Sequence, residues 1–373
     1  MAYIPKSHNT IASAPSIGAT QARLRPTVGY GLGGFPERVE GYIRPQTYLI
    51  ATQELASGAE VFVFDVFDVT APPVIVGTVA TRTNFANATG TYVYGDYAYV
   101  VGRTNNMVSV IDISDPLNPS YASQFATANS PGAAGLSTDG YLYIANNVTL
   151  SLQTFDLNTS PTAPTKVSDI ASVIAAGTQG MSLDEEGDRL WTTSTSGDSI
   201  TCFNVAARDA PVQIAVTTDV TYLENSEPVA SKGGHAFLNS GFDGQISSWL
   251  ATLPSTVARV GGVSYTSANS NGSAVWANGY TYSAETNTNG MIYFSSDPTT
   301  GSVGSGAKTT EANSGNFKGV IVDARGEYLY ATSVNEDKVG IFNVSNGGEP
   351  LLESVVIDAI NHPDIGIGAL YIP

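Results

Sequence analysis

Residues 107–125 read MVSVIDISDPLNPSYASQF, an apolar strand that ends in Asp112 and runs through a proline-rich turn into another strand. The same pattern recurs along the chain, each time as an apolar run that ends in Asp or Asn. The copies are EVFVFDV (60–66), MVSVIDI (107–113), LSLQTFDL (150–157), SITCFNV (199–205) and KVGIFNV (338–344). Their polar anchors are Asp65, Asp112, Asp156, Asn204 and Asn343. The first three spacings between anchors are 47, 44 and 48 residues, so the sequence repeats with a nearly constant period.

The number of units follows from the one long interval. Asn204 and Asn343 are 139 residues apart, which is three steps of the same period. Two weaker copies lie inside this interval, QISSWLA (245–251) and MIYFSSD (291–297). The chain therefore contains seven units. Self-similarity at such a period, with four short strands in each unit, indicates a β-propeller.

The second unit shows the strand and turn chemistry. GTYVYG (90–95) is followed by a Gly95-Asp96 turn, YAYVVGR (97–103) by a polar turn at 104–106, and MVSVIDI by a DPLNP turn. Tyr, Val and Ile fill the runs, and Gly, Asn, Asp and Pro separate them, as in strands joined by tight turns. One such sheet cannot bury both faces alone, and a closed ring also removes exposed strand edges. We predict an all-β protein, a seven-bladed β-propeller of four-stranded antiparallel blades, over residues 46–373.

Two stretches resemble known repeat families. FDVFDVTAPPVIVGTV and IDISDPLNPSYASQF are similar to the LVIVD-type propeller repeat, and YLYATSVNEDKVGIFNVSNG is similar to the YVTN-type repeat. YVTN-type repeats occur in surface-layer and lactonase-like propellers. The resemblance covers residues 46–373 and implies the architecture, whereas enzymes, adhesins and scaffolds all use such rings.

Both ends of the chain have predicted roles. NHPDIGIGALYIP (361–373) follows a complete seventh unit, and the first unit, from TYLIATQ (47–53), lacks an innermost strand. We therefore expect Ile365–Ile372 to close the first blade, with RVEGYI at Arg38–Ile43 as the rival donor.

Residues 1–45 form a separate region, which we expect to be an extended N-terminal arm. The region has no apolar core of the kind found in secretory signals or membrane anchors, so no membrane insertion is predicted. Its net charge is positive, and we expect it to dock onto other protein chains of a larger assembly, with a disordered tail as the alternative. The candidate docking residues are Lys6, Arg23, Arg25, Arg38 and Arg44.

Composition limits the partners. The formal net charge is −17 and the pI is near 4.4, which argues against nucleic acid and anionic membranes. Charged residues make up only 13% of the chain, so Ser, Thr, Asn and Gly form much of the surface, a pattern that suits an exposed or virion protein. The single Cys202 lies in a strand pattern and is predicted to be a core residue.

The search for chemistry yields no catalytic, cofactor-binding or metal-binding residue. The three histidines, His8, His235 and His362, have no metal-ligand spacing, and no nucleophile elbow or P-loop occurs. His362 beside Asp364 could form an acid–base pair at the central channel, although turn capping is the simpler interpretation. Asp184, Glu185, Glu186 and Asp188 form an acidic hairpin, for which we expect a solvated turn rather than a calcium site.

Two sets of polar residues recur with the repeat. The Asp and Asn anchors are expected to accept hydrogen bonds from main-chain N–H groups of the turns that follow them. The turns between second and third strands should share one rim of the ring, and there we predict a candidate binding surface for a glycan, a host-surface ligand or a protein. Its residues are Asn105, Asn106, Asn146, Asn147, Asp198, Asn287, Asn289, Glu336 and Asp337.

Three functional hypotheses follow. The first is a non-enzymatic structural or attachment propeller, most concretely a bacteriophage virion component mounted through its arm. The second is a lactonase-like propeller enzyme that uses carboxylates and a histidine around the channel. The third is an extracellular or surface-layer binding protein. We favour the first on sequence grounds, because the chain combines a basic arm with no recognisable catalytic motif.

Overall fold

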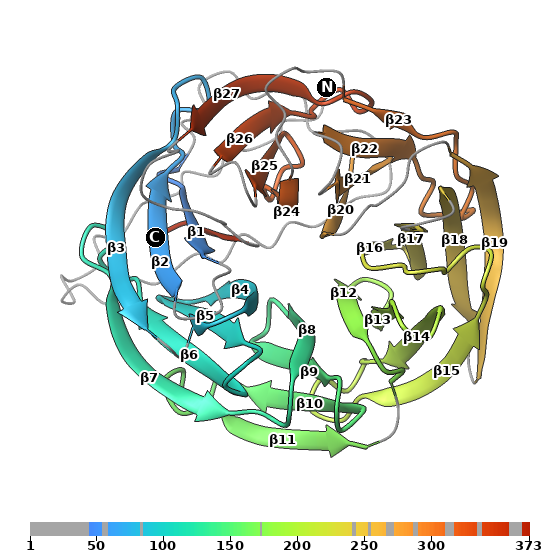
Figure 1. Cartoon of the computed structure of the whole chain (residues 1–373), viewed down its shortest axis with the longest axis horizontal. Helices are drawn as coiled ribbons and strands as arrows, with labels where there is room; N and C mark the ends of the chain where they lie inside the picture. Colours follow the sequence, from blue (N-terminus) through green and yellow to red (C-terminus); the bar gives the residue numbers. More distant parts are fainter. Residues whose placement is uncertain are drawn as a thin grey trace, which may run out of the picture. The chain divides into compact units, whose positions relative to one another are not determined.

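The computed structural model describes residues 45–53, 59–82, 85–171, 174–240, 244–252, 255–265, 272–285, 290–309, 317–333, 338–357 and 368–373. In these ranges 28 strands form seven four-stranded antiparallel sheets, and the sheets stand as blades around a ring (Figure 1). The predicted seven-bladed β-propeller is thus confirmed. The described ranges contain no helix of the length and hydropathy needed to cross a membrane.

The strands of each blade follow one another from the innermost to the outermost. Blade one contains β28 (Ala369–Tyr371), β1 (Tyr48–Thr52), β2 (Ala59–Asp65) and β3 (Val74–Arg82). Blade two contains β4 (Ala88–Tyr94), β5 (Tyr97–Gly102), β6 (Met107–Asp112) and β7 (Ser120–Ala126). Blade three contains β8 (Pro131–Leu136), β9 (Tyr141–Asn146), β10 (Ser151–Asp156) and β11 (Thr165–Ile170). Blade four contains β12 (Thr178–Asp184), β13 (Arg189–Ser194), β14 (Ser199–Asn204) and β15 (Val212–Thr218).

The remaining three blades complete the ring. Blade five contains β16 (Val229–Lys232), β17 (His235–Asn239), β18 (Gln245–Thr252) and β19 (Thr256–Ser264). Blade six contains β20 (Ala274–Ala277), β21 (Tyr280–Glu285), β22 (Gly290–Ser295) and β23 (Ala307–Lys308). Blade seven contains β24 (Phe317–Val322), β25 (Tyr328–Ser333), β26 (Lys338–Asn343) and β27 (Leu351–Ile357).

The C-terminal strand closes the ring as predicted. β28 pairs antiparallel with β1 through Tyr48–Tyr371, Leu49–Leu370 and Ile50–Ala369, and it becomes the innermost strand of blade one. Tyr371 is 3% exposed, and its hydroxyl donates to Asp96 Oδ1 of blade two at 3.0 Å. The last strand therefore joins the two ends of the chain and also holds the neighbouring blade.

The repeated anchors have the structural role expected of them. In all five copies the anchor side-chain oxygen accepts a hydrogen bond from the main-chain N–H two residues later, which fixes the turn into the outer strand. The pairs are Asp65–Phe67 (3.0 Å), Asp112–Ser114 (2.9 Å), Asp156–Asn158 (2.8 Å), Asn204–Ala206 (3.0 Å) and Asn343–Ser345 (3.1 Å). In the two weaker copies the strand register places Leu250 and Ser295 at this position.

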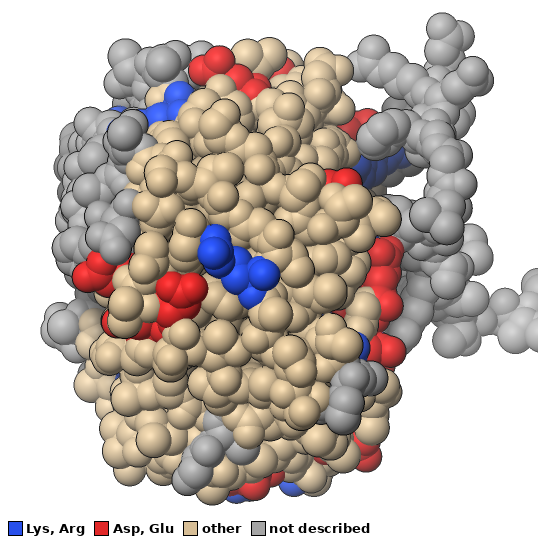
Figure 2. Space-filling model, turned by 90° about the vertical axis from the view of Figure 1, so that its right-hand side faces the viewer, with Lys and Arg blue, Asp and Glu red and all other residues tan. Residues whose placement is uncertain are grey.

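Apolar side chains fill the spaces between blades. One buried cluster joins blades four and five and includes Trp191, Cys202 and Trp249. Cys202 is fully buried, as predicted for a core residue, and burial raises the pKa of its thiol. The outer wall on the β19 side carries few charges (Figure 2), in agreement with the low charged fraction of the sequence.

The predicted arm cannot be compared with the structure. Residues 1–44, which include all five candidate docking residues and the rival strand Arg38–Ile43, lie outside the described ranges. The arm, its boundary and its docking role remain predictions.

Candidate functional site

The predicted rim lies on the side of the ring where second strands turn into third strands and where blades are connected. Asn105 and Asn106 lie in the turn between β5 and β6, Asn147 in the turn between β9 and β10, and Asp198 in the turn between β13 and β14. Asn287, Asn289, Glu336 and Asp337 lie outside the described residues. Asn146 is the last residue of β9 and is fully buried, so its assignment to the exposed rim is wrong.

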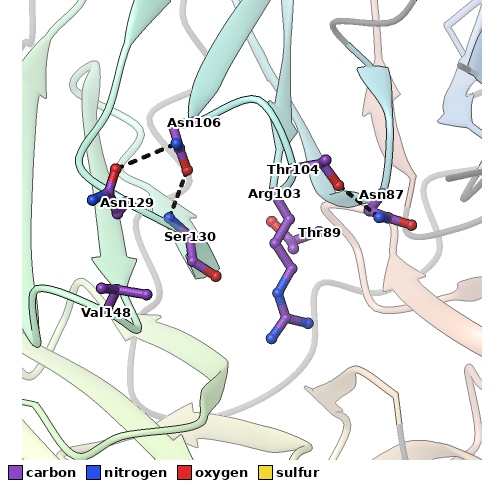
Figure 3. Close-up of a pocket in the computed structure, with 8 residues that line it drawn as sticks. All are labelled: Asn87, Thr89, Arg103, Thr104, Asn106, Asn129, Ser130 and Val148. Carbon is purple, nitrogen blue, oxygen red and sulfur yellow. Dashed lines mark hydrogen bonds between the residues drawn. The ribbon is translucent and has the colours of Figure 1, made fainter. Parts of the chain in front are cut away.

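The structure brings one part of this rim together with residues that the rim prediction omitted. An open pocket of about 700 Å³ lies between blades two and three. Of the rim residues, Asn106 lines it. The full lining in the described residues is Asn87, Thr89, Arg103, Thr104, Asn106, Asn129, Ser130 and Val148 (Figure 3).

Hydrogen bonds hold one wall of the pocket. Asn106 Oδ1 accepts from the Ser130 main-chain N–H at 2.6 Å, and Asn106 Nδ2 donates to Asn129 Oδ1 at 3.3 Å. These bonds tie the β5–β6 turn to the connection that leads into blade three. On the other wall Asn87 Nδ2 donates to Thr104 Oγ1 at 2.6 Å. The polar groups therefore hold defined orientations without a ligand.

The backbone around the pocket is strained. Asn87, Asn106 and Ser130 have φ values of 51°, 55° and 58°, in the left-handed region. Asn tolerates this region better than most residues, whereas Ser rarely adopts it. Such strain persists where the surrounding structure enforces it, and it gathers at functional sites. Three of the eight described non-glycine residues with positive φ line this one pocket, which marks it as a candidate site.

Arg103 is the charged residue of the described lining. Its side chain stands between the two hydrogen-bonded walls and points into the open space (Figure 3). Among the described residues no Asp or Glu forms an ion pair with it. A guanidinium without a carboxylate partner, surrounded by amides and hydroxyls, can accept an anionic or hydroxylated ligand.

A difference between repeats explains why the pocket opens at this place. The residue after the second strand is Arg103 in blade two and Asn147 in blade three. In blade three this residue packs over a bulge at Gly132, where an added Cβ would collide with the Asn147 carboxamide. The bulge residue in blade two is Thr89, whose side chain occupies the corresponding place. Arg103 therefore extends into the pocket, whereas both polar atoms of Asn147 are buried.

Asp198 has a structural partner. Its Oδ1 accepts from the Asn225 main-chain N–H at 3.2 Å, which fastens the connection between blades four and five.

The sequence prediction missed Arg103, although the repeats contain a usable signal. The position six residues after the start of the second strand is occupied in blades one to seven by Glu54, Arg103, Asn147, Thr195, Gly241, Thr286 and Val334. Arg103 is the one basic residue in this set, and the residue that breaks a repeat is a candidate for function.

His235 does not take the role required by the enzyme hypothesis. It is 5% exposed, and its Nδ1 lies 3.2 Å from Gly233 O and 3.1 Å from Pro298 O, two main-chain carbonyls. The ring therefore helps to join blades five and six and has no carboxylate at Nδ1. His362 and Asp364 lie outside the described residues.

The acidic hairpin between β12 and β13 joins blades, so the prediction of a solvated turn is wrong. Each of its four carboxylates has a protein partner, and Asp184 is 3% exposed. The partners are Gly187 and Gly234 for Asp184, Thr138 for Glu185, Lys232 for Glu186 and Arg208 for Asp188. Over the described ranges, no group of three His, Cys, Asp or Glu residues is arranged to hold a metal ion.

Comparison with known proteins supports the repeat resemblance. Residues 87–127 match the family model described as the LVIVD repeat, and they span blade two and most of the pocket lining. Blade two is an LVIVD repeat. No curated protein matches the sequence.

Solved structures share the ring. A protein from Bacteroides fragilis, provisionally named a 6-phosphogluconolactonase, is 14% identical with a TM-score of 0.65, and the match covers 88% of this chain and 98% of that one. The periplasmic gluconolactonase of Pseudomonas aeruginosa is 15% identical with a TM-score of 0.63, covering 88% and 100%. The WD40 domain of Toxoplasma gondii coronin is 12% identical with a TM-score of 0.56, covering 86% and 77%. At these identities the likeness shows the fold.

The comparisons bear differently on the three functional hypotheses. Two of the named neighbours are lactonases by name, so the expectation of a non-enzymatic protein receives no support from them. None of the three is named as a virion component. Mounting in a virion and location at the virion or cell surface stay predictions.

Proposed function

We propose that the propeller binds a small hydroxylated molecule, such as a monosaccharide or the end of a glycan, in the pocket between blades two and three. The observation that carries this proposal is the set of fixed, strained polar residues around an open space of about 700 Å³. Ligand pockets commonly have volumes of about 300–1,000 Å³ and a few precisely placed polar groups.

The lining favours recognition through hydrogen bonds. The amides of Asn87 and Asn129 and the hydroxyls of Thr104 and Ser130 can exchange hydrogen bonds with sugar hydroxyl groups. Val148 is 66% exposed at the edge, where it offers a small apolar surface. Because the pocket is open and polar, we expect a ligand to bind with modest affinity and high selectivity for hydroxyl geometry.

Hydrolysis of a sugar lactone is a second candidate function. It is favoured by the names of two structural neighbours, and at 14–15% identity this is an analogy of fold. The described lining holds no carboxylate or imidazole to act as a general base. Binding is therefore the function that the described residues support better.

A steric block of the pocket tests the proposal. Titration with a panel of monosaccharides, followed by saturation-transfer NMR, should detect binding to the unmodified protein. Val148→Trp should abolish it, whereas Val220→Trp, at a 71% exposed valine between blades four and five, should not. Binding that survives Val148→Trp would place the ligand elsewhere. Release of acid from D-glucono-1,5-lactone, measured in the same samples above the spontaneous rate, tests the second candidate.

A further inference from the structure

We propose that the ligand of this pocket carries a single carboxylate, that Arg103 binds the carboxylate, and that Asn106 is the positioning residue of the site. This inference rests on the proposed function and adds the charge of the ligand to it. It also separates two roles within the lining, one of contact with the ligand and one of support.

Arg103 stands apart from carboxylates in a strongly acidic protein. The sequence contains 33 Asp and Glu against 16 Lys and Arg. Several other cations of the described residues have anionic neighbours, and the ion pairs are Lys166–Asp169, Arg208–Asp139, Arg208–Asp188, Lys232–Glu186, Lys308–Glu285 and Arg325–Glu327. Arg103 has none of these, although carboxylates are in excess. A guanidinium kept clear of carboxylates inside a pocket is available for an anion from outside.

The charge balance within the pocket fits one negative charge on the ligand. The described lining contains one cation, and its other members are amides, hydroxyls and one valine. A single negative charge on the ligand is thus neutralised, while a second one would find no partner and would lose hydration. The planar guanidinium donates two parallel hydrogen bonds to a carboxylate, which adds orientation to charge. The lining therefore matches a hydroxylated monocarboxylate.

Asn106 supports the pocket wall. Its carboxamide is occupied on both sides, by the Ser130 N–H and by Asn129 Oδ1. Figure 3 shows the Ser130 hydroxyl on the side of the pocket that faces Arg103. Ser130 keeps a φ of 58° while its N–H is held by Asn106. Asn106 thereby sets the position of a hydroxyl that can bind the ligand next to its carboxylate.

Calorimetric titration with three probes of matched hydroxyl pattern tests the charge. D-Glucose, D-gluconate and D-glucarate carry no, one and two carboxylates. We expect gluconate to bind at least about tenfold more tightly than glucose, the effect of one charge-assisted pair. Glucarate should gain no more than the statistical factor of about two over gluconate, because the second carboxylate has no cation.

Two variants assign the residues. Arg103→Met should lower gluconate affinity to that of glucose without changing the melting temperature. Asn106→Asp retains an acceptor for the Ser130 N–H but adds a negative charge beside Arg103, and it should weaken gluconate much more than glucose. A purely structural role of Asn106 would weaken both probes equally.

The outcomes separate this inference from the proposed function. If glucose and gluconate bind equally and both are lost in Val148→Trp, the carboxylate assignment is overturned while sugar binding stands. If gluconate affinity is unchanged in Arg103→Met, the assignment to Arg103 is wrong. If no probe binds at about 10 mM, an affinity weaker than about −3 kcal/mol, both proposals fail.

Discussion

The closure of the ring by β28 gives the sharpest test of the fold. Tyr371 is 3% exposed, packs in the buried cluster shared by blades one and two, and stacks on Tyr48 with ring centroids 6.4 Å apart. Replacing a buried aromatic residue by alanine destabilises a protein by about 3–5 kcal/mol. Since a folded domain is stable by about 5–15 kcal/mol, Tyr371→Ala should remove a large part of the free energy of unfolding.

The hydrogen bond to Asp96 can be separated from the packing. Tyr371→Phe keeps the ring and removes the hydroxyl that donates to Asp96 Oδ1 at 3.0 Å. A hydrogen bond to a charged group contributes about 1.5–3 kcal/mol, and the partial exposure of Asp96 reduces that contribution, so we expect a loss of about 1–2 kcal/mol. The remainder of the alanine effect is then the packing of the aromatic ring.

Urea unfolding measures these losses, and hydrogen exchange locates them. Exchange in Tyr371→Ala should rise first in β1 and β4, the strands that lie against β28. The control is Ile372→Ala, because Ile372 is the next residue and is 49% exposed; its effect should stay within about 0.5 kcal/mol. If Tyr371→Ala behaves like this control, the C-terminal strand does not hold the ring closed.

Three further predictions concern the blade contacts. Tyr143→Phe removes a hydroxyl that donates to the main-chain oxygen of Arg208 at 3.0 Å, and urea unfolding should show a loss of about 1 kcal/mol. Gly132→Ala places a methyl group against the Asn147 carboxamide and a main-chain oxygen of blade four, so its melting temperature should fall, and an unchanged value would disprove the close packing. Hydrogen bonds from the hydroxyl of Thr300 and from main-chain N–H groups hold the pKa of Asp297 below its ordinary value of 3.8. This carboxylate therefore stabilises the fold above pH 3.8 and ceases to do so as the pH falls through the lowered pKa. Asp297→Asn should show a shallower loss of stability in acid, and parallel curves would contradict the assignment.

The features that sequence reasoning predicted well are those set by local geometry. Asp112 binds an N–H two residues away, so its role can be inferred from the anchor and its turn alone. Cys202 lies in an apolar strand pattern, and its burial follows from that pattern. The acidic hairpin was misjudged because its partners come from both neighbouring blades, at a distance in sequence that no local pattern records.

The pocket shows where sequence reasoning stops. Asn106 was named for its place in a turn, and the structure gives it two partners more than 20 residues away. Arg103 and Asn147 occupy the same position of the repeat but have opposite environments, because one packs beside Thr89 and the other over Gly132. Equivalent sequence positions therefore do not imply equivalent surfaces.

The sequence alone determined the number of blades, the polar anchors and the strand that closes the ring, because a repeat carries its strand order and turn chemistry within each copy. The tertiary structure alone decided which polar residues meet. Asn87, Arg103 and Ser130 come from separate segments, and their side chains face one space only after blade two packs against blade three. The physical reason is range: turns form through neighbours in sequence, whereas a pocket is the volume left between packed side chains that the chain brings together last.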